Sequence, residues 1–180
     1  VALMLAIYRR IPYVNRVMRE GRWPTPEMRE TCFQISGKTV GLVGFGHIGR
    51  MVAHRLSGFD AEIVYADTLR ADAKTEQRLK ARHVPLEQLL AGSDIISLHA
   101  PLTDQTRHII NAASIAGMRD GAVVINTARG DLVDDLALYQ ALASGKLRGA
   151  GLDAFACEPP AADNPLFSLD QVVVTPHAGG

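Results

Sequence analysis

Short runs of consecutive apolar residues alternate with helical patterns along most of the chain. The runs are rich in β-branched residues and predict strands at residues 39–43, 62–66, 94–99, 122–126, 150–154 and 172–175. Helical patterns between them predict helices at 48–57, 85–91, 112–118 and 132–144. Runs such as Ala122–Ile125 do not alternate polar with apolar positions, which is typical of strands buried on both faces of a parallel sheet. The sequence therefore predicts a doubly wound α/β fold with a mostly parallel sheet.

The beginning of the chain has a different pattern. Residues 1–10 have the composition of a helix, and we expect Pro12 to break or restart it before a second helix at 13–20. Residues 21–37 are polar and contain Trp23-Pro-Thr-Pro26, so we expect a connector there. We therefore predict one domain over residues 1–180. It consists of an N-terminal helical segment and connector, 1–36, and an α/β core, 37–180.

Composition and charge narrow the class of protein. The 180 residues are 47% hydrophobic, which is enough for a full core. Lys and Arg balance Asp and Glu at 19 each, so bulk charge gives no reason to expect a nucleic-acid or membrane partner. Two cysteines, Cys32 and Cys157, are too few for a disulfide framework, so we expect a cytoplasmic protein. The histidines show no ligand spacing, and we expect no metal site.

Both ends of the sequence suggest a longer parent chain. The first residue is Val1 rather than Met, no capping residue precedes the first helix, and the last residue, Gly180, comes three residues after His177. The longest apolar run, Val1–Tyr8, is far shorter than the roughly 20 residues that span a bilayer. It also lacks the basic region and cleavage site of a signal peptide. We therefore expect truncation at both ends.

A glycine motif, Gly44-Phe-Gly-His-Ile-Gly49, follows the strand 39–43 and opens a helix. Glycines at these positions allow a tight turn and let the backbone approach a pyrophosphate, to which the helix N-terminus offers free N–H groups. Asp67 closes the next strand, where a carboxylate accepts hydrogen bonds from ribose hydroxyls and repels a 2′-phosphate. This favours NAD over NADP, although Arg70 lies close by. An S-adenosylmethionine methyltransferase or a plain strand–helix turn would also explain the loop alone.

Three later strands end on reactive side chains, namely Arg129, Glu158 and His177. Ligands of an open parallel sheet bind outside the carboxyl ends of its strands. There a guanidinium can anchor a carboxylate bidentately, and an imidazole can exchange a proton near neutral pH while a neighbouring acid fixes its tautomer. Each residue alone has a structural explanation, as a turn, a surface acid or a packed histidine. Together they predict a site for a small anionic substrate, such as a 2-oxo acid.

Four further segments occur in a specific order around the glycine motif. They are Leu98-His-Ala-Pro-Leu-Thr103, Asn126-Thr-Ala-Arg-Gly130 with Leu132-Val-Asp134, Asp153-Ala-Phe-Ala-Cys-Glu-Pro159 and Thr175-Pro-His177. The sequence resembles the D-isomer-specific 2-hydroxyacid dehydrogenase family, over essentially the whole chain, as the Rossmann-type NAD-binding domain of that family. The resemblance implies an NAD-dependent interconversion of a D-2-hydroxy acid and its 2-oxo acid, without identifying the acid.

The resemblance also implies roles for residues at matching positions. Arg129 would bind the substrate carboxylate, His177 would be the acid/base, and Glu158 would be its partner. The cofactor residues that it implies are Gly44, Gly46, His47, Ile48 and Gly49 at the pyrophosphate, Asp67 at the ribose, Ala100, Pro101 and Thr106 at the nicotinamide side, and Thr127, Ala128 and Asp153 around the carboxamide.

Two features of this chain depart from the family pattern, namely His47 and the length of the chain. His47 stands where the family often has Arg, so a phosphate contact is expected to be weaker or pH-dependent. Family members are much longer and include a substrate domain, so we expect this chain to bind NAD but to turn over substrate poorly.

The resemblance implies a homodimer, with Val1–Trp23 near the interface. Glu158, rather than Gln, argues against the formate dehydrogenase branch. A dinucleotide-sensing protein, similar to the family's transcriptional corepressors, is the alternative function.

Overall fold

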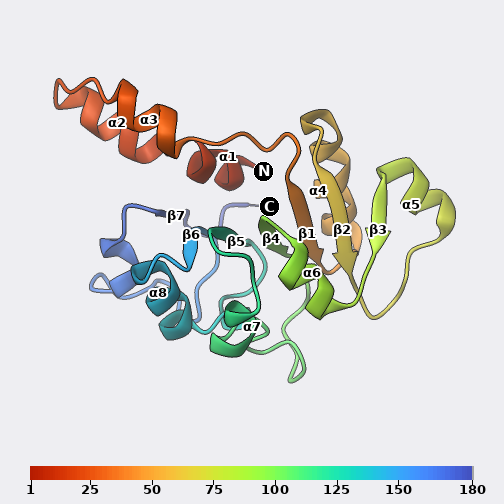
Figure 1. Ribbon diagram of the computed structural model, residues 1–180. Coiled ribbons are helices and arrows are strands. Elements are labelled where there is room, and N and C mark those ends of the chain that lie inside the picture. Colours follow the sequence, from red (N-terminus) through yellow and green to blue (C-terminus); the bar gives the residue numbers. More distant parts are fainter. Residues whose placement is uncertain (180) are drawn as a thin grey trace.

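Seven parallel strands form one sheet in residues 1–179, the part of the chain that the computed structural model describes (Figure 1). The order across the sheet is β3-β2-β1-β4-β5-β6-β7, and each neighbouring pair is parallel. The strands are β1 (Thr39–Val43), β2 (Glu62–Ala66), β3 (Ala81–His83), β4 (Ile95–Leu98), β5 (Ala122–Asn126), β6 (Leu147–Leu152) and β7 (Val172–Val174). The order reverses between β1 and β4, as in a doubly wound fold, so the predicted fold class is confirmed.

Helices cover both faces of the sheet (Figure 1). They are α1 (Ala2–Tyr8), α2 (Ile11–Arg19), α3 (Thr25–Thr31), α4 (His47–Leu56), α5 (Ala73–Leu79), α6 (Leu86–Gly92), α7 (Ala112–Ala116) and α8 (Asp135–Ala143). One core, around Leu42 and Tyr65, packs under α1, α4 and α5, and the other, around Leu98 and Val124, packs under α6, α7 and α8. The central strands are buried on both faces, which explains their unbroken apolar sequence. No helix in residues 1–179 is long and apolar enough to cross a membrane.

Two segments differ from the sequence prediction. Residues 21–37 are not only a connector, because α3 forms within them, with Pro in its first turn, Glu27 at its start and Arg29 at its end. The chain between β2 and β4 also contains α5 and the short strand β3, which the sequence analysis left unassigned. The strand β3 lies at the edge of the sheet and carries Arg82 and His83, so it lacks the apolar run by which the other strands were found.

Several predicted boundaries move by a few residues. Helix α8 begins three residues later than predicted, because Gly130–Leu132 forms a 3₁₀ turn and the Asp134 carboxylate caps α8 by accepting from the N–H groups of Leu136 and Ala137 at 3.0 and 3.1 Å. Helix α2 begins at Ile11 and includes Pro12 in its first turn, where a missing N–H costs nothing. Strand β6 begins and ends earlier than predicted. The final residue of the predicted core, Gly180, lies outside the described residues.

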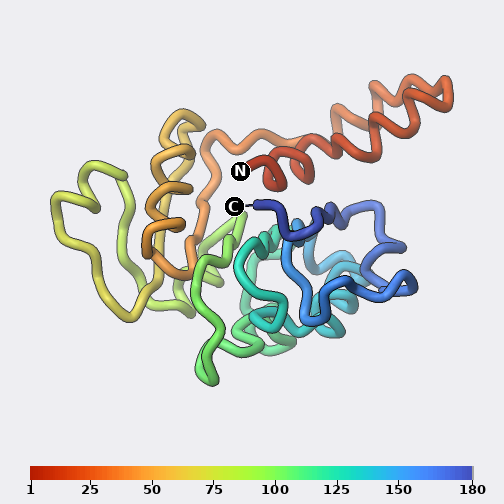
Figure 2. Tube along the Cα trace, turned by 180° about the vertical axis from the view of Figure 1, so that it is seen from behind, coloured from red at the N-terminus to blue at the C-terminus, as the bar shows by residue number. Residues whose placement is uncertain are grey.

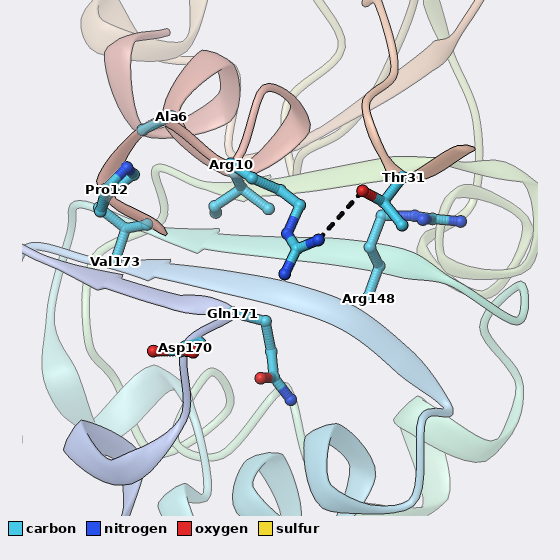
Figure 3. Close-up of a pocket in the computed structure, with 9 residues that line it drawn as sticks. Ala6, Arg10, Pro12, Thr31, Arg148, Asp170, Gln171 and Val173 are labelled. Carbon is cyan, nitrogen blue, oxygen red and sulfur yellow. Dashed lines mark hydrogen bonds between the residues drawn. The ribbon is translucent and has the colours of Figure 1, made fainter. Parts of the chain in front are cut away.

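Helices α2 and α3 form an arm that projects from the body of the molecule in both views (Figures 1 and 2). Arg10 joins the two helices, because its guanidinium Nη1 donates to Glu27 at 2.7 Å and to Thr31 Oγ1 at 3.0 Å. Beneath this contact, α1 and the strands β6 and β7 enclose a pocket of about 290 Å³ that Arg148 also lines (Figure 3). Arg148 stacks over the Phe33 ring at 3.9 Å, which ties the connector after α3 to the sheet.

Helix α1 packs unusually close to strand β6, because two residues of that strand are glycines. A Cβ built on Gly151 would lie 2.9 Å from Leu3 Cβ and 2.9 Å from Ile125 Cδ1. A Cβ on Gly149 would lie 2.7 Å from Ile7 Cγ2. A Cβ on Gly149 would also lie 2.8 Å from Gln171 O, so neither site has room for a methyl group unless α1 and its neighbours in the sheet shift.

We therefore predict that Gly151→Ala lowers the free energy of unfolding by about 1–3 kcal/mol, the usual cost of overpacking a core. The measurement is urea denaturation followed by circular dichroism. Gly92→Ala is the matched control, because nothing lies within 4 Å of its Cβ position at the end of α6, and it should leave stability nearly unchanged. Equal stabilities for the two variants would contradict the close packing of α1 on β6.

Candidate active site

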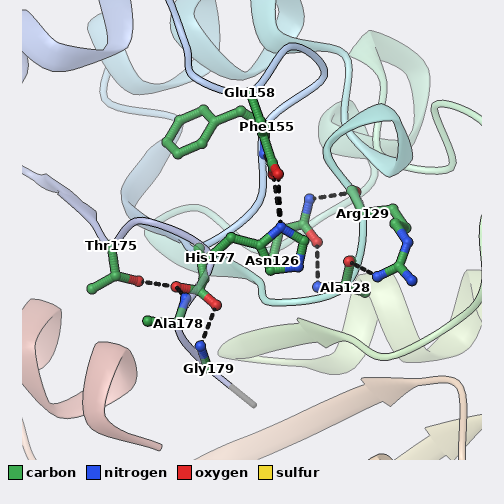
Figure 4. Close-up of polar contacts among 10 residues, drawn as sticks. Asn126, Ala128, Arg129, Phe155, Glu158, Thr175, His177, Ala178 and Gly179 are labelled. Atoms are coloured by element: carbon green, nitrogen blue, oxygen red, sulfur yellow. Dashed lines mark hydrogen bonds and ion pairs between the residues drawn. The ribbon is translucent and has the colours of Figure 1, made fainter.

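The ends of β5, β6 and β7 bring three chain segments to one edge of the sheet (Figure 4). Because these strands are parallel, each segment leaves the sheet on the same side. They carry Arg129, Glu158 and His177, which the sequence analysis singled out. The parallel register thus places the three segments together, as expected for strand ends in an open α/β sheet.

His177 and Glu158 form a direct pair. Nδ1 of His177 lies 2.8 Å from Oε2 and 2.9 Å from Oε1 of Glu158. The Phe155 N–H also donates to Glu158 Oε1 at 3.0 Å. This N–H is the largest cause that lowers the pKa of Glu158, and the contact with His177 adds to it, so the carboxylate stays ionised. A carboxylate on Nδ1 fixes the ring and leaves Nε2 for proton exchange with a ligand.

A buried carboxylate holds the backbone around His177. Asp153 is only 2% exposed at the end of β6, where it accepts hydrogen bonds from the Thr175 hydroxyl, from Ala178 N–H at 3.0 Å and from Gly179 N–H at 2.8 Å. Burial alone would raise the pKa of Asp153, but these donors outweigh it and lower the pKa. A Cβ on Gly179 would lie 2.6 Å from Asp153 Oδ2, so this grip requires glycine.

The turn that carries Arg129 is held by another buried polar side chain. Asn126 is 1% exposed; its Oδ1 accepts from Ala128 N–H at 3.1 Å and its Nδ2 donates to Arg129 O at 2.8 Å. The Arg129 guanidinium is exposed and donates to Ala128 O at 2.7 Å, turned away from the His177 ring (Figure 4). Arg129 is thus beside the pair without touching it. Its charge still contributes to lowering the pKa of Glu158.

The loops after β5 and β6 touch each other through their backbones. A Cβ on Gly130 would overlap the backbone where Phe155 joins Ala156, so only glycine fits where the loops cross. Asn126, Gly130 and Thr175 also shape the site, and the sequence pattern did not single them out. The sequence signal was weak, because each is a small or polar residue within a quoted motif. The contacts of Asn126 lie in the turn after its own strand, whereas those of Gly130 and Thr175 come from a different strand end.

The glycine loop between β1 and α4 has the form that a pyrophosphate needs. Gly44 has φ +92°, and a Cβ there would lie 2.7 Å from Ala100 N. Gly49 lies directly against the carbonyl of Gly44, whereas nothing lies within 4 Å of a Cβ on Gly46. No side chain caps α4, so its first N–H groups, including those of His47 and Ile48, have no partner within the helix. The loop therefore offers open space and free donors where a phosphate group would bind.

Asp67 is tied to the glycine loop. Its Oδ2 accepts from Phe45 N–H at 2.6 Å and its Oδ1 accepts from Leu69 N–H at 3.0 Å. Partial burial would raise the pKa of Asp67, but these N–H donors outweigh that effect and lower the pKa. The Thr68 hydroxyl also donates to Oδ1 at 3.3 Å, whereas Oδ2 keeps a second acceptor position. The carboxylate can therefore stay ionised and accept ribose hydroxyls while it holds the loop.

The loop after β4 faces the glycine loop. Ala100 lies closest to Gly44, and the Thr106 hydroxyl donates to Pro101 O at 2.7 Å and so closes this loop on itself. Thr127 belongs to the turn that Asn126 holds. The structure thus gives Thr106 and Asp153 local partners, and their predicted contacts to a cofactor stay predictions. His99 precedes the loop; burial lowers its pKa to about 4, consistent with a packed, neutral ring.

An apolar pocket of about 420 Å³ lies beside the Glu158–His177 pair. Phe155 and Phe167, with ring centroids 5.8 Å apart, line it together with Val174 and Pro176. An apolar wall next to the exposed Glu158–His177 pair keeps water from one side of it. Across residues 1–179, no three His, Cys, Asp or Glu side chains are placed to hold a metal ion.

Comparison with known proteins gives a consistent result. The family described as "D-isomer specific 2-hydroxyacid dehydrogenase, NAD binding domain" matches residues 1–179. Hydroxypyruvate reductase from Thermotoga maritima is 46% identical over 99% of this chain and 57% of that protein. Glyoxylate reductase from Korarchaeum cryptofilum is 44% identical over 98% of this chain and 54% of that protein. The chain thus spans about half the length of the curated relatives that it matches.

Solved structures agree with the sequence relatives. A formate dehydrogenase from Granulicella has a TM-score of 0.97 at 31% identity, over 100% of this chain and 48% of that chain. D-mandelate dehydrogenase from Rhodotorula graminis has a TM-score of 0.92 at 36% identity, over 98% of this chain and 53% of that chain. With the fold, the glycine loop and the order of the strand-end residues, these matches show that the chain belongs to the D-isomer specific 2-hydroxyacid dehydrogenase family and corresponds to its NAD-binding domain.

Proposed function

We propose that this chain is the dinucleotide-binding part of an NAD-dependent oxidoreductase that interconverts a D-2-hydroxy acid and its 2-oxo acid. The observation that carries the proposal is the Glu158–His177 pair, with Nδ1 of His177 2.8 Å from Glu158, at the same sheet edge as the glycine loop. Oxidation of formate releases no hydroxyl proton, whereas a hydroxy acid must lose one. An imidazole held by a carboxylate therefore favours a hydroxy acid as substrate.

His177 has the central role in the proposed mechanism. During reduction, its Nε2 donates a proton to the carbonyl oxygen of the 2-oxo acid, and during oxidation it takes the hydroxyl proton back. Glu158 stabilises the protonated ring and fixes its tautomer. When bound, the dinucleotide supplies or accepts the hydride at the substrate carbon. Arg129 binds the substrate carboxylate after its guanidinium exchanges Ala128 O for the ligand.

The residues that would hold the dinucleotide come after the carboxyl ends of β1, β2, β4, β5 and β6. We place the pyrophosphate at Gly44, Gly46 and Gly49, where the backbone N–H groups of His47 and Ile48 are free to donate. The exposed carboxylate positions of Asp67 suit the adenosine ribose and favour NAD, since a 2′-phosphate would meet a negative charge. The nicotinamide side would lie between Ala100, Pro101 and Thr106 on one side and Thr127, Ala128 and Asp153 on the other.

The relatives suggest small substrates. The curated relatives include proteins named hydroxypyruvate reductase, glyoxylate reductase and D-3-phosphoglycerate dehydrogenase, all of them names that specify small 2-oxo or 2-hydroxy acids. We propose an acid of that class for this chain, in the full-length protein that carries it. The cysteines, Cys32 and Cys157, are both free, which is compatible with the proposed cytoplasmic location.

We also propose that the chain forms a homodimer through the arm of α2 and α3. This arm exposes Ile11, Met18 and Trp23 by 49%, 42% and 76%. Together with Val14 and Met28 they line an open hollow of about 790 Å³. Arg10 holds α3 against the start of α2, and the arm that they form projects from the body of the molecule (Figure 2). A second copy would cover the face and give each arm a partner surface.

Removal of the acid/base tests the reaction. His177→Ala in the full-length protein should lower kcat with a 2-oxo acid by a factor of about 10²–10⁴, the usual contribution of such a group. Arg129→Ala is the companion variant: it should weaken substrate binding and turnover and leave the affinity for NAD nearly unchanged. Steady-state kinetics over a panel of 2-oxo acids measures both. Unchanged turnover in His177→Ala would instead support the alternative of a dinucleotide-sensing interaction protein.

Filling the open space at Gly46 tests the dinucleotide site. Gly46→Ala should keep the stability of the protein, because its Cβ meets no protein atom within 4 Å, and should weaken NAD⁺ binding about tenfold by blocking hydrogen bonds to the pyrophosphate. Calorimetric titration with NAD⁺ measures the affinity. Gly58→Ala, which also meets nothing within 4 Å, is the control and should change neither quantity. Normal NAD⁺ affinity in Gly46→Ala would rule out this loop as the phosphate site.

A charge on the arm tests the dimer. Met18→Glu should convert a dimer into a monomer, because a carboxylate at a covered apolar face loses its hydration without gaining a partner. Light scattering during size-exclusion chromatography gives the mass. Leu136→Glu on α8 is matched in chemistry, since Leu136 is 65% exposed and lies away from the arm, and it should leave the dimer intact. A monomeric wild-type chain would refute the proposal.

A further inference from the structure

A small network of polar contacts lies next to Asp67, and the proposed reaction does not use it. Arg70 follows Asp67 by three residues in the loop after β2, and Glu76 lies on α5. The Arg70 guanidinium donates to both carboxylate oxygens of Glu76, from Nε at 3.0 Å and from Nη2 at 2.9 Å. The Tyr65 hydroxyl donates to Glu76 Oε1 at 2.6 Å and accepts from Ala71 N–H at 3.0 Å. The guanidinium is therefore held in a bidentate pair rather than left free.

The exposures show which partner is fixed. The Glu76 side chain is 15% exposed, whereas the Arg70 side chain is 67% exposed. Arg70 donates two hydrogen bonds to Glu76 and Tyr65 donates a third, and together they lower the pKa of Glu76 to about 2, with Arg70 the larger cause. Most exposed ion pairs contribute little, but bidentate geometry with a third donor is the favourable exception. Glu76 is thus an ionised, anchored acceptor that holds an exposed cation.

The network is also continuous with the dinucleotide loop. Tyr65 is fully buried and stacks on Phe45, with ring centroids 3.8 Å apart at an angle of 16°. Phe45 belongs to the glycine loop, and its N–H donates to Asp67. The position of Glu76 is therefore fixed relative to Asp67 through Tyr65 and Phe45. Arg70 is the cation of the segment Asp67–Asp72, which borders the site proposed for the adenosine ribose.

We propose that Glu76 is a specificity-determining residue, which holds Arg70 away from an adenosine 2′-phosphate and so helps the chain to reject NADP. This inference rests on the proposed dinucleotide site. Two carboxylates then act on cofactor choice in different ways. Asp67 repels a 2′-phosphate directly, whereas Glu76 removes the one guanidinium of the neighbouring loop that could neutralise that phosphate.

The test compares cofactor affinities in Glu76→Gln. Glutamine keeps an oxygen for the Tyr65 hydroxyl and suits a helix as well as glutamate does, but it cannot hold Arg70 through two charged contacts. The affinity for NADP⁺ relative to NAD⁺ should rise about tenfold, as expected for one charge-assisted contact to a phosphate. Calorimetric titration with NAD⁺ and NADP⁺, repeated with 5′-AMP and 2′,5′-ADP, isolates the effect of the 2′-phosphate. Glu76→Asp, which withdraws the carboxylate by one methylene, should show a smaller gain in the same direction.

Two further variants identify the group responsible. The double variant Glu76→Gln, Arg70→Gln should return the affinity ratio to the wild-type value, because the released guanidinium is gone. Asp120→Asn removes a carboxylate from a different surface pair, with Lys146 at 2.7 Å, and should leave the ratio unchanged. Thermal unfolding of each variant shows that it is folded.

The outcomes separate this inference from the proposed function. An unchanged ratio in Glu76→Gln and Glu76→Asp, with normal NAD⁺ binding, would overturn the role of Glu76 and leave the dinucleotide site intact. A gain that persists in the double variant would overturn it as well, since Arg70 would not be the group released. A wild-type chain that binds neither NAD⁺ nor 5′-AMP would refute the proposed dinucleotide site itself, and the inference with it.

Discussion

The hydrogen bonds that pair β4, β5, β6 and β7 in parallel determine where Arg129, Glu158 and His177 lie. Parallel pairing sends the loop after each strand to the same edge, and the reversal of order between β1 and β4 opens that edge to a ligand. The apolar sequence of the strands follows from the same arrangement, because helices bury both faces. Fold and site are thus two results of one pairing pattern.

Buried polar side chains then convert this coarse arrangement into a defined geometry. Asn126 ends β5 and Asp153 follows β6, and both are almost inaccessible to water. Asn126 binds the backbone of the turn after β5, and Asp153 binds the backbone after β7. A buried polar group without a partner would be costly, whereas a fully bonded one makes a single loop conformation much more stable than its rivals. Gly130 and Gly179 complete the arrangement by leaving space for the contacts.

The sequence predicted the doubly wound sheet, six of the strands and the placement of Arg129, Glu158 and His177 at strand ends. These features can be predicted because each depends on residues that are close in the sequence, namely an apolar run and the turn residues that follow it. It did not predict α3, α5 and β3, where short polar segments form regular structure through contacts with distant residues such as Arg10 and Tyr65. Nor did it show that Arg70 pairs with Glu76, since the pairing depends on how α5 folds back toward β2.

The hydrogen bonds that Asp153 accepts from the chain around His177 have a consequence for how such sites diversify. All three groups that Asp153 binds, in Thr175, Ala178 and Gly179, belong to this chain. The backbone around His177 is therefore held by contacts within this chain alone. Segments outside this network could therefore be exchanged without disturbing the Glu158–His177 geometry, provided that Asp153 and Gly179 are kept together.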